Sequence, residues 1–431
     1  MLLVTGAARG QAITALGSFN NTNGAYPWAG VVRDGAGHLY GVTQLGGASG
    51  VGTIFTVPEA GGAITALASF SQLNGETPRG GLVRNAAGDL FGTTILGGPQ
   101  NRGVVFGLAS GATVPTTLAY CRFDTGNSPY GSLFMDSLGA LWGTANTGGG
   151  FGTIFRVDPG SDVPATIASF TFANGASPSS GLVADGSGAL YGTTQSGGAN
   201  GRGVVFKLSP GASDITVLAS FDANSGDEPW GSVVLDEQGN IYGTTNRGGA
   251  TNNGTLFKVP AGSGMVVTLQ SFIVTNGAAP IGGLLRDAAG HLFGVTQAGG
   301  LGDHGVLFRY DPASGVMTTF AFSGGNGSAP RGVTLVADGA GNLYGTTALG
   351  GSSNVGVVFK ATGFGVVVSP PPCPGDADGN RTVNFADINA VLSNWGAVYP
   401  GGSGPGDANL DGVVNFGDVS AVLTNWGVVC P

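Results

Sequence analysis

The chain has 431 residues, a formal net charge of −9 and 42% hydrophobic residues, and glycine and proline contribute 84 and 22 positions. So much glycine and proline is typical of low-complexity chains, but a disordered coil is far less apolar, so we expect a folded protein with a large core. The acidity argues against nucleic acid as the main partner, no apolar run approaches the ~20 residues of a membrane span, and three cysteines exclude a disulfide-rich miniprotein.

The first segment, residues 1–11, has an apolar patch but lacks the basic start and the longer apolar stretch of a signal peptide. We interpret it as an export signal that is missing or begins at the wrong residue. The protein is then expected to be secreted or displayed at the cell surface.

A block of about 50 residues recurs seven times within residues 12–365. Each block contains Gly-x-Leu-(Tyr/Phe/Trp)-Gly-(Thr/Val)-Thr or a close variant, here called the anchor motif, then a Gly-Gly pair and a Gly-(Val/Thr)-(Val/Ile/Leu)-Phe motif. The aromatic residues of the anchor motifs are Tyr40, Phe91, Trp142, Tyr191, Tyr242, Phe293 and Tyr344. The phenylalanines of the later motif are Phe55, Phe106, Phe155, Phe206, Phe257, Phe308 and Phe359. Much of the high glycine count is therefore periodic.

Each block is predicted to form four short strands and has no room for a helix. In the second block, residues 64–70 alternate as a half-buried strand does, and residues 81–84, 90–94 and 104–106 follow. Seven such blocks predict an all-β, seven-bladed β-propeller of four-stranded repeats, with an open β-solenoid as the alternative. By analogy with other propellers, the Gly-Leu-Val type of strand is innermost. Residues 13–19 would then complete the seventh blade and remove an open sheet edge.

A turn precedes each anchor motif, and its acidic or amide residue stands three positions before a glycine. These residues are Asp34, Asn85, Asp136, Asp185, Asp236, Asp287 and Asp338. A ring of metal ligands is one interpretation. We favour tight turns, in which the side-chain oxygen accepts backbone N–H bonds and glycine adopts a positive φ, because this also explains the glycine and Asn85.

Another turn ends in proline, and the residue that follows it varies from block to block. These seven residues are Trp28, Arg79, Tyr130, Ser179, Trp230, Ile281 and Arg331. On a propeller they would surround one mouth of the channel, where Trp28, Arg79, Tyr130, Trp230 and Arg331 would suit stacking on sugar rings or recognition of a partner. Packing between blades is the alternative interpretation.

Catalysis has little support in the sequence. His38 and His291 occupy one turn position that other blocks fill with Asp, Ala or Asn, which predicts exposed turn residues, and His304 lies in a variable loop. No nucleophile, base and orienting group stand together.

The repeats resemble those of the GloVer family of secreted bacterial proteins, through Leu-Tyr-Gly-Thr-Thr, Gly-Gly and Val-Val-Phe-Lys over about residues 12–365. That family carries different C-terminal anchoring modules. The resemblance brings no catalytic residues with it.

A Pro-rich linker, residues 366–372, leads into a module of residues 373–431 that contains a duplicated loop. Oxygen donors stand at positions 1, 3, 5, 7, 9 and 12 of each copy, with a backbone carbonyl at position 7, as in an EF-hand loop around Ca²⁺. The first copy supplies Asp376, Asp378, Asn380, Thr382, Asn384 and Asp387. The second supplies Asp407, Asn409, Asp411, Val413, Asn415 and Asp418. We therefore expect two calcium ions.

Each loop is predicted to run into a helix, beginning near Phe385 and Phe416 and stopped by Gly396 and Gly427. The module resembles a type I dockerin, which docks secreted proteins onto a cohesin domain. The resemblance implies a cohesin-like partner. Two departures are Arg381 in place of a loop glycine, and Phe385 and Phe416 where a Ser-Thr pair is more familiar after loop position 9.

Cys373 and Cys430 bracket this module. In an exported protein they are expected to form a disulfide, with two free thiols as the alternative. Cys121 stands where other blocks have a phenylalanine at a strand end, which predicts an inert buried thiol.

The sequence thus favours a secreted, non-catalytic propeller displayed through a calcium-dependent dockerin-like module. A polysaccharide-degrading or carbohydrate-binding component of an extracellular complex is the alternative, and a platform for protein interactions is a third interpretation.

Overall fold

The computed structural model describes residues 10–368, 385–395, 407 and 413–424. The chain divides into two compact units, the repeat region and the C-terminal region, which are described in turn.

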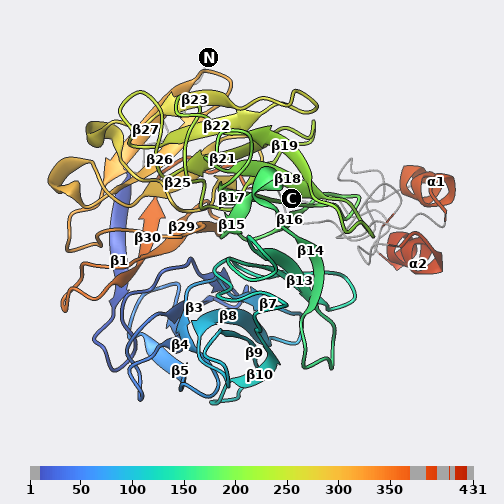
Figure 1. Ribbon diagram of the computed structural model, residues 1–431. Coiled ribbons are helices and arrows are strands. Elements are labelled where there is room, and N and C mark those ends of the chain that lie inside the picture. Colours follow the sequence, from blue (N-terminus) through green and yellow to red (C-terminus); the bar gives the residue numbers. More distant parts are fainter. Residues whose placement is uncertain (1–9, 369–384, 396–406, 408–412, 425–431) are drawn as a thin grey trace. The chain divides into compact units, whose positions relative to one another are not determined.

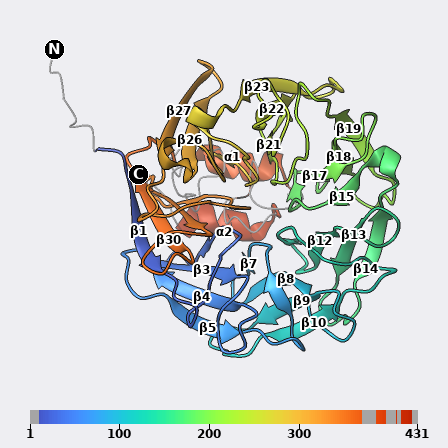
Figure 2. The ribbon, with the colours of Figure 1, turned by 60° about the vertical axis from the view of Figure 1, so that its left-hand side comes forward.

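The repeat region is a β-propeller of seven antiparallel sheets around a common centre (Figures 1 and 2). Blades 1 to 3 contain β2 (Val32–Arg33), β3 (His38–Thr43), β4 (Thr53–Pro58), β5 (Thr65–Ser69); β7 (Val83–Arg84), β8 (Leu90–Leu96), β9 (Val104–Leu108), β10 (Thr116–Tyr120); and β11 (Phe134–Met135), β12 (Leu141–Ala145), β13 (Thr153–Val157), β14 (Ala165–Ser169). Blades 4 and 5 contain β16 (Val183–Ala184), β17 (Leu190–Ser196), β18 (Val204–Leu208), β19 (Thr216–Ser220); and β20 (Val234–Leu235), β21 (Ile241–Thr245), β22 (Thr255–Val259), β23 (Val267–Ser271). Blades 6 and 7 contain β24 (Leu285–Arg286), β25 (Leu292–Thr296), β26 (Val306–Asp311), β27 (Val316–Ala321); and β28 (Val336–Ala337), β29 (Leu343–Thr347), β30 (Val357–Thr362), β1 (Ala12–Ser18). The predicted four-stranded blades are confirmed.

Two blades carry a short fifth strand that the sequence did not predict. β6 (Glu76–Pro78) pairs with β8, and β15 (Ala176–Pro178) pairs with β17. In the other blades, only an isolated β-bridge forms at the equivalent place, such as that between Ala25 and Leu45. The extra strands therefore arise where the second strand is longer, at seven residues.

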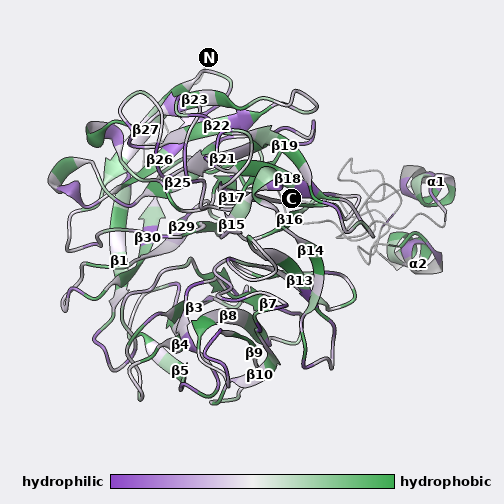
Figure 3. Cartoon of the chain, in the orientation of Figure 1, coloured by the Kyte–Doolittle hydropathy of each residue, from purple (hydrophilic) through white to green (hydrophobic). Residues whose placement is uncertain are grey.

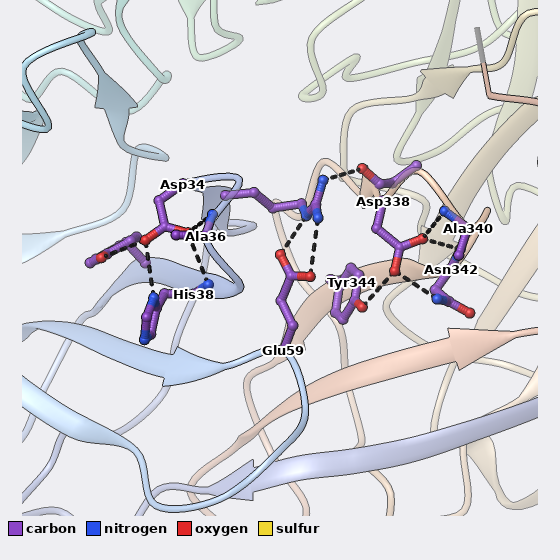
Figure 4. A network of polar contacts seen from close by, with 11 residues as sticks. Asp34, Ala36, His38, Glu59, Asp338, Ala340, Asn342 and Tyr344 are labelled. Carbon is purple, nitrogen blue, oxygen red and sulfur yellow. Dashed lines mark hydrogen bonds and ion pairs between the residues drawn. The ribbon is translucent and has the colours of Figure 1, made fainter. Parts of the chain in front are cut away.

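The first strand of the chain completes the last blade, as predicted. β1 pairs with β30 in antiparallel register, from Ala12 opposite Thr362 to Ser18 opposite Val357. A polar network strengthens this junction between blades 7 and 1 (Figure 4). Arg33 of blade 1 donates to both carboxylate oxygens of Glu59 at 2.6 and 3.0 Å and to the Ala337 carbonyl of blade 7 at 3.2 Å.

The second glycine of each anchor motif leaves room for the phenylalanine ring on the next strand of the same blade. Gly41 lies opposite Phe55, and a Cβ added to this glycine would meet the Phe55 ring at 2.6 Å. The same pairing recurs in every blade, for example between Gly192 and Phe206. The two motifs are therefore parts of one packing unit, which explains why they recur together in every block.

These phenylalanines also join neighbouring blades. The residue directly after each fourth strand packs edge-to-face or tilted on the next blade's phenylalanine, as in Phe19 on Phe55 with ring centres 4.9 Å apart. The other pairs are Phe70–Phe106, Phe170–Phe206, Phe221–Phe257, Phe272–Phe308 and Phe322–Phe359. The second blade is different, because Cys121 follows its fourth strand and donates the same backbone bond, to Gly103, that Phe70 donates to Gly52. Cys121 is buried as predicted, and burial raises the pKa of its thiol to about 12.

The predicted acidic turns are confirmed as turns. Asp34 Oδ1 accepts the N–H groups of Ala36 and His38, at 2.8 and 3.0 Å. Its Oδ2 accepts the Tyr40 hydroxyl at 3.1 Å, so the anchor aromatic is tied to the turn before it. Partial burial raises the pKa of Asp34, but these hydrogen bonds outweigh it and bring the pKa down to about 2.

The apolar residues lie mostly along the strands of the propeller, and the connecting loops are more polar (Figure 3). This pattern is the one expected when the strands of adjacent blades bury their faces against each other.

The C-terminal unit contains two helices, α1 (Phe385–Ser393) and α2 (Phe416–Thr424), where the sequence predicts them. Val391, Val414 and Val422 form its small core. Leu392 and Leu423 stand at equivalent positions, and each is 58% exposed. The predicted stop residues Gly396 and Gly427 lie outside the described residues, as does the proposed Cys373–Cys430 disulfide.

We expect Phe170→Cys, which copies the natural Cys121 at another blade interface, to lower the free energy of unfolding of the propeller by about 2–4 kcal/mol through a buried cavity. The control Phe172→Cys alters a neighbouring ring that is 46% exposed and should cost much less. Chemical denaturation of both variants measures the difference. Equal losses would show that the buried ring pairs do not hold the blades together.

Asp34→Asn tests the acidic turn, because it keeps one acceptor oxygen and removes the charge. The folded pKa of about 2 lies below the usual aspartate pKa of 3.8, so the carboxylate stabilises the fold above about pH 4 and this stabilisation is lost as the pH falls towards 2. Asp34→Asn should therefore lower the free energy of unfolding at pH 7 by about 1–2 kcal/mol and flatten its decline in acid. Thermal melts from pH 7 to pH 2 measure this, with the exposed loop variant Asp214→Asn as control. A wild-type profile for Asp34→Asn would contradict the turn's role.

Candidate functional site

The seven variable residues predicted at the channel mouth do converge. Trp28, Arg79, Tyr130, Ser179, Trp230 and Ile281 line one hollow, which contains about 410 Å³ of space including its opening to solvent. Arg331 contacts Trp28 there. This hollow is called the mouth below. That it binds a ligand stays a prediction, but its geometry can be built up from the chain.

The backbone before each mouth residue has an unusual conformation. The residue before the turn proline has a left-handed φ of 50–56° in all seven blades, although none is glycine. Ser128 is typical: its N–H donates to the Arg102 carbonyl of the preceding blade at 3.0 Å, and its carbonyl accepts the Asn146 N–H at 3.3 Å. Hydrogen bonds on both sides thus hold a strained residue, and the mouth residue follows two positions later.

Neighbouring blades approach closely through their backbones next to the mouth residues. A Cβ added to Gly231 would meet the Gly282 carbonyl oxygen at 2.1 Å, and one added to Gly30 would meet that of Thr334 at 2.1 Å. Hydroxyl-bearing residues Ser132, Ser232 and Thr334 also line the hollow. Small residues therefore line the hollow beside the aromatic and cationic ones.

Cationic and aromatic residues alternate across four consecutive blades, in the order Arg331, Trp28, Arg79 and Tyr130. The Arg79 guanidinium carbon lies 4.5 Å from the centre of the Trp28 ring and 5.3 Å from that of Tyr130. The Arg331 guanidinium carbon lies 5.2 Å from the Trp28 ring centre. Tyr130 in turn meets Trp230 edge-to-face at 6.4 Å. These variable residues thus pack against residues of neighbouring blades and also lie at the mouth, so the two interpretations from the sequence do not exclude each other.

Several polar groups at the mouth have unused hydrogen-bonding capacity. Arg79 Nε donates to Gln44 Oε1 at 3.1 Å, yet within the described ranges neither Arg79 nor Arg331 forms an ion pair. Arg331 Nε and Trp230 Nε1 are buried without a hydrogen-bond partner in the same part of the chain. Burial lowers the pKa of Arg79, and the charge of Arg331 lowers it further.

A second set of polar residues near the mouth is absent from the sequence prediction. Asn146 donates to Ser179 Oγ at 2.8 Å, Gln195 donates to the same oxygen, and Gln44 holds Arg79. Each directly follows an anchor motif, where five of seven blocks carry Asn or Gln: Gln44, Asn146, Gln195, Asn246 and Gln297. That recurrence is the signal that identifies them.

The histidines confirm the turn prediction only in part. The His38 side chain is exposed at 48%, as predicted, but that of His291 is only 15% exposed. The chain leaving the propeller covers this turn, because Val367 donates to Asp287 Oδ2 at 3.0 Å and accepts from Ala288 at 2.9 Å. The sequence prediction of an exposed His291 is therefore wrong. His304 contacts Ser328 Oγ at 3.0 Å in its loop.

Five of the twelve predicted calcium ligands lie in the described part of the C-terminal unit. Asp387, Asp407 and Asp418 are buried, at 0%, 2% and 0% exposure. The Asn415 side-chain amide donates to the Val413 carbonyl at 2.9 Å, and Asp418 Oδ2 accepts the Asn415 N–H at 2.7 Å. The other seven, Asp376, Asp378, Asn380, Thr382, Asn384, Asn409 and Asp411, lie outside the described residues.

Buried carboxylates fit a hard divalent cation, which takes oxygen ligands and offsets their desolvation. Among the residues that the structure describes, no group of three or more acidic, histidine or cysteine side chains is placed to hold a metal. Loop positions 3 and 5 fall in the undescribed stretches, so calcium binding stays a prediction.

The repeat family model described as the Gloeobacter/Verrucomicrobia repeat matches residues 4–186 and 149–359, which is most of the chain. The chain belongs to the Gloeobacter/Verrucomicrobia repeat family. This confirms the predicted GloVer resemblance of the propeller, and the match ends before the C-terminal module. No curated protein matches this family member.

Several solved structures match the chain at low sequence identity. The extracellular domain of a protein described as a one component system from B. thetaiotaomicron is 12% identical, with a TM-score of 0.51, over 81% of this chain and 40% of that one. A gluconolactonase from Xanthomonas campestris is 18% identical, with a TM-score of 0.42, over 68% and 87%. A puromycin-hydrolyzing peptidase from Mycobacterium tuberculosis is 13% identical, with a TM-score of 0.49, over 76% and 50%. Within the described ranges, the repeat protein has no helix long and apolar enough to cross a membrane.

Proposed function

We propose that this repeat-family protein is a secreted, non-catalytic binding protein, whose propeller holds a saccharide ligand at the mouth. The observation that carries the proposal is the convergence of six of the seven equivalent, variable positions on one hollow, with Arg331 against Trp28, so that aromatic rings lie beside guanidinium and hydroxyl donors. Indole and phenol rings bind sugar faces, and guanidinium, hydroxyl and amide groups bind sugar hydroxyls.

The chemical groups around the hollow favour binding and orientation of a ligand. Its lining consists of aromatic, guanidinium, hydroxyl, aliphatic and backbone groups, and within the described part of the chain it includes no carboxylate or imidazole. Acid–base cleavage of a glycosidic bond uses a pair of carboxyl groups, so a binding role accounts for this lining more simply.

We further propose that the C-terminal module anchors the protein to a cohesin-like partner when it holds two calcium ions. The duplicated loops and the two helices at the predicted places support this, together with the burial of Asp387, Asp407 and Asp418. In this proposal the loop oxygens hold the cations, and the exposed Leu392 and Leu423 offer a symmetrical apolar surface to the partner.

Binding at the mouth is tested by titrating the full chain with saccharides that a glycan array identifies. The double variant Trp28→Ala with Trp230→Ala removes the two indole rings and should weaken binding by about tenfold or more. The control Phe172→Ala removes an exposed ring elsewhere, and thermal melts verify that each variant folds. Unchanged affinity in a folded double variant would exclude the mouth as the binding site.

The anchor is tested by adding EDTA to the full chain while recording circular dichroism and the thermal melt. We expect the C-terminal transition to move to lower temperature, because metal binding contributes directly to the stability of such loops. The propeller transition should stay in place. Asp418→Asn, with Asp214→Asn as the exposed control, should reduce calcium affinity and the retention of a cohesin domain in a pull-down. A melt that EDTA leaves unchanged would remove the calcium proposal.

A further inference from the structure

The two arginines at the mouth differ from five others of the propeller. Arg33, Arg156, Arg202, Arg247 and Arg286 each pair with a carboxylate. Arg79 and Arg331 have no such partner in the described residues, although they stand close enough for each charge to affect the other. Two adjacent, partly buried cations without an anion are unfavourable in the free protein, and the protein as a whole is acidic, with a net charge of −9.

Stacking gives these two groups a defined orientation. Both guanidinium carbons lie within 5.2 Å of the centre of the same Trp28 ring. A guanidinium group in contact with an aromatic face keeps the N–H donors at its edge available for in-plane, bidentate bonds to an anion. Gln44 takes only one of the five donors of Arg79. The donors are thus held in place with capacity to spare.

The surroundings of the two arginines are those of a sugar site. Ser132, Ser232 and Thr334 supply hydroxyl groups at the same hollow. A free inorganic anion would use the arginines alone and leave these groups unoccupied. A ligand that carries both an anionic group and several hydroxyls would use them all.

We propose that the mouth recognises an acidic sugar, whose carboxylate or sulfate groups pair with Arg79 and Arg331. This inference rests on the proposed function, because it names the class of saccharide that the mouth binds. The anionic groups offset the desolvation and mutual repulsion of the two guanidinium groups, and the sugar hydroxyls bind the serines and Thr334.

The test is calorimetric titration of the full chain with four probes: trigalacturonate, a sulfated galactose oligosaccharide, neutral galactotriose, and sodium acetate. We expect at least one acidic oligosaccharide to bind about tenfold or more tightly than galactotriose, and acetate to bind much more weakly than either. The carboxylated and sulfated probes distinguish the two sources of the anion.

Arg79→Gln and Arg331→Gln, alone and together, remove the charges and keep hydrogen-bonding side chains. They should abolish the preference for acidic over neutral sugar. Arg102→Gln is the matched control, because Arg102 also lies on an aromatic ring, that of Phe123, but outside the hollow. Thermal melts verify that each variant folds.

The possible outcomes distinguish a failure of this inference from a failure of the proposed function. If galactotriose binds as well as the acidic probes, and does so through Trp28 and Trp230, the proposed function stands and the inference is wrong. An acidic preference that survives in the folded double arginine variant also overturns the inference. If no saccharide binds the wild-type chain, the proposed function and the inference both fail.

Discussion

The structure depends on one recurring contact, the phenylalanine that ends each Val-Val-Phe type of motif. Its ring covers the anchor glycine of its own blade and packs on the strand-end ring of the blade before it, as Phe55 does with Gly41 and Phe19. The glycine cannot be larger, because a Cβ there would lie 2.6 Å from the ring. The same contact therefore joins two strands within a blade and packs that blade on its neighbour. β1 closes the propeller, so that the last interface between blades resembles the others.

In this scaffold, the residues that pack the blades together are different from the seven variable residues at the mouth. The seven positions at the mouth share one backbone conformation, with a strained residue before each proline that backbone hydrogen bonds stabilise. Their side chains can therefore differ without disturbing the blades, and they do, from Trp28 to Ser179 to Ile281. The unpaired charges of Arg79 and Arg331 are tolerable because both groups stack on Trp28.

Periodicity made most of the fold predictable from the sequence. The blade number, strand order, closing strand and acidic turns follow from motifs that recur seven times, and the same alignment placed the variable residues at one mouth. Contacts between distant segments could not be predicted: the cover that Val367 provides over His291, the left-handed residues before the prolines, and the stacking of two arginines on one ring. The amide residues after the anchor motifs were not predicted as part of the site. Their role depends on hydrogen bonds from Asn146 and Gln195 to Ser179, which the alignment of the repeats does not show.

In the proposed function, the C-terminal module is the anchor and the propeller mouth is the binding site. The most direct measurement of the central claim is a crystal structure of the full chain with trigalacturonate or a sulfated galactose oligosaccharide bound. We expect a sugar in the mouth, with its anionic groups on Arg79 and Arg331 and its hydroxyls on the surrounding serines. A sugar bound elsewhere on the propeller, with the mouth empty, would contradict it.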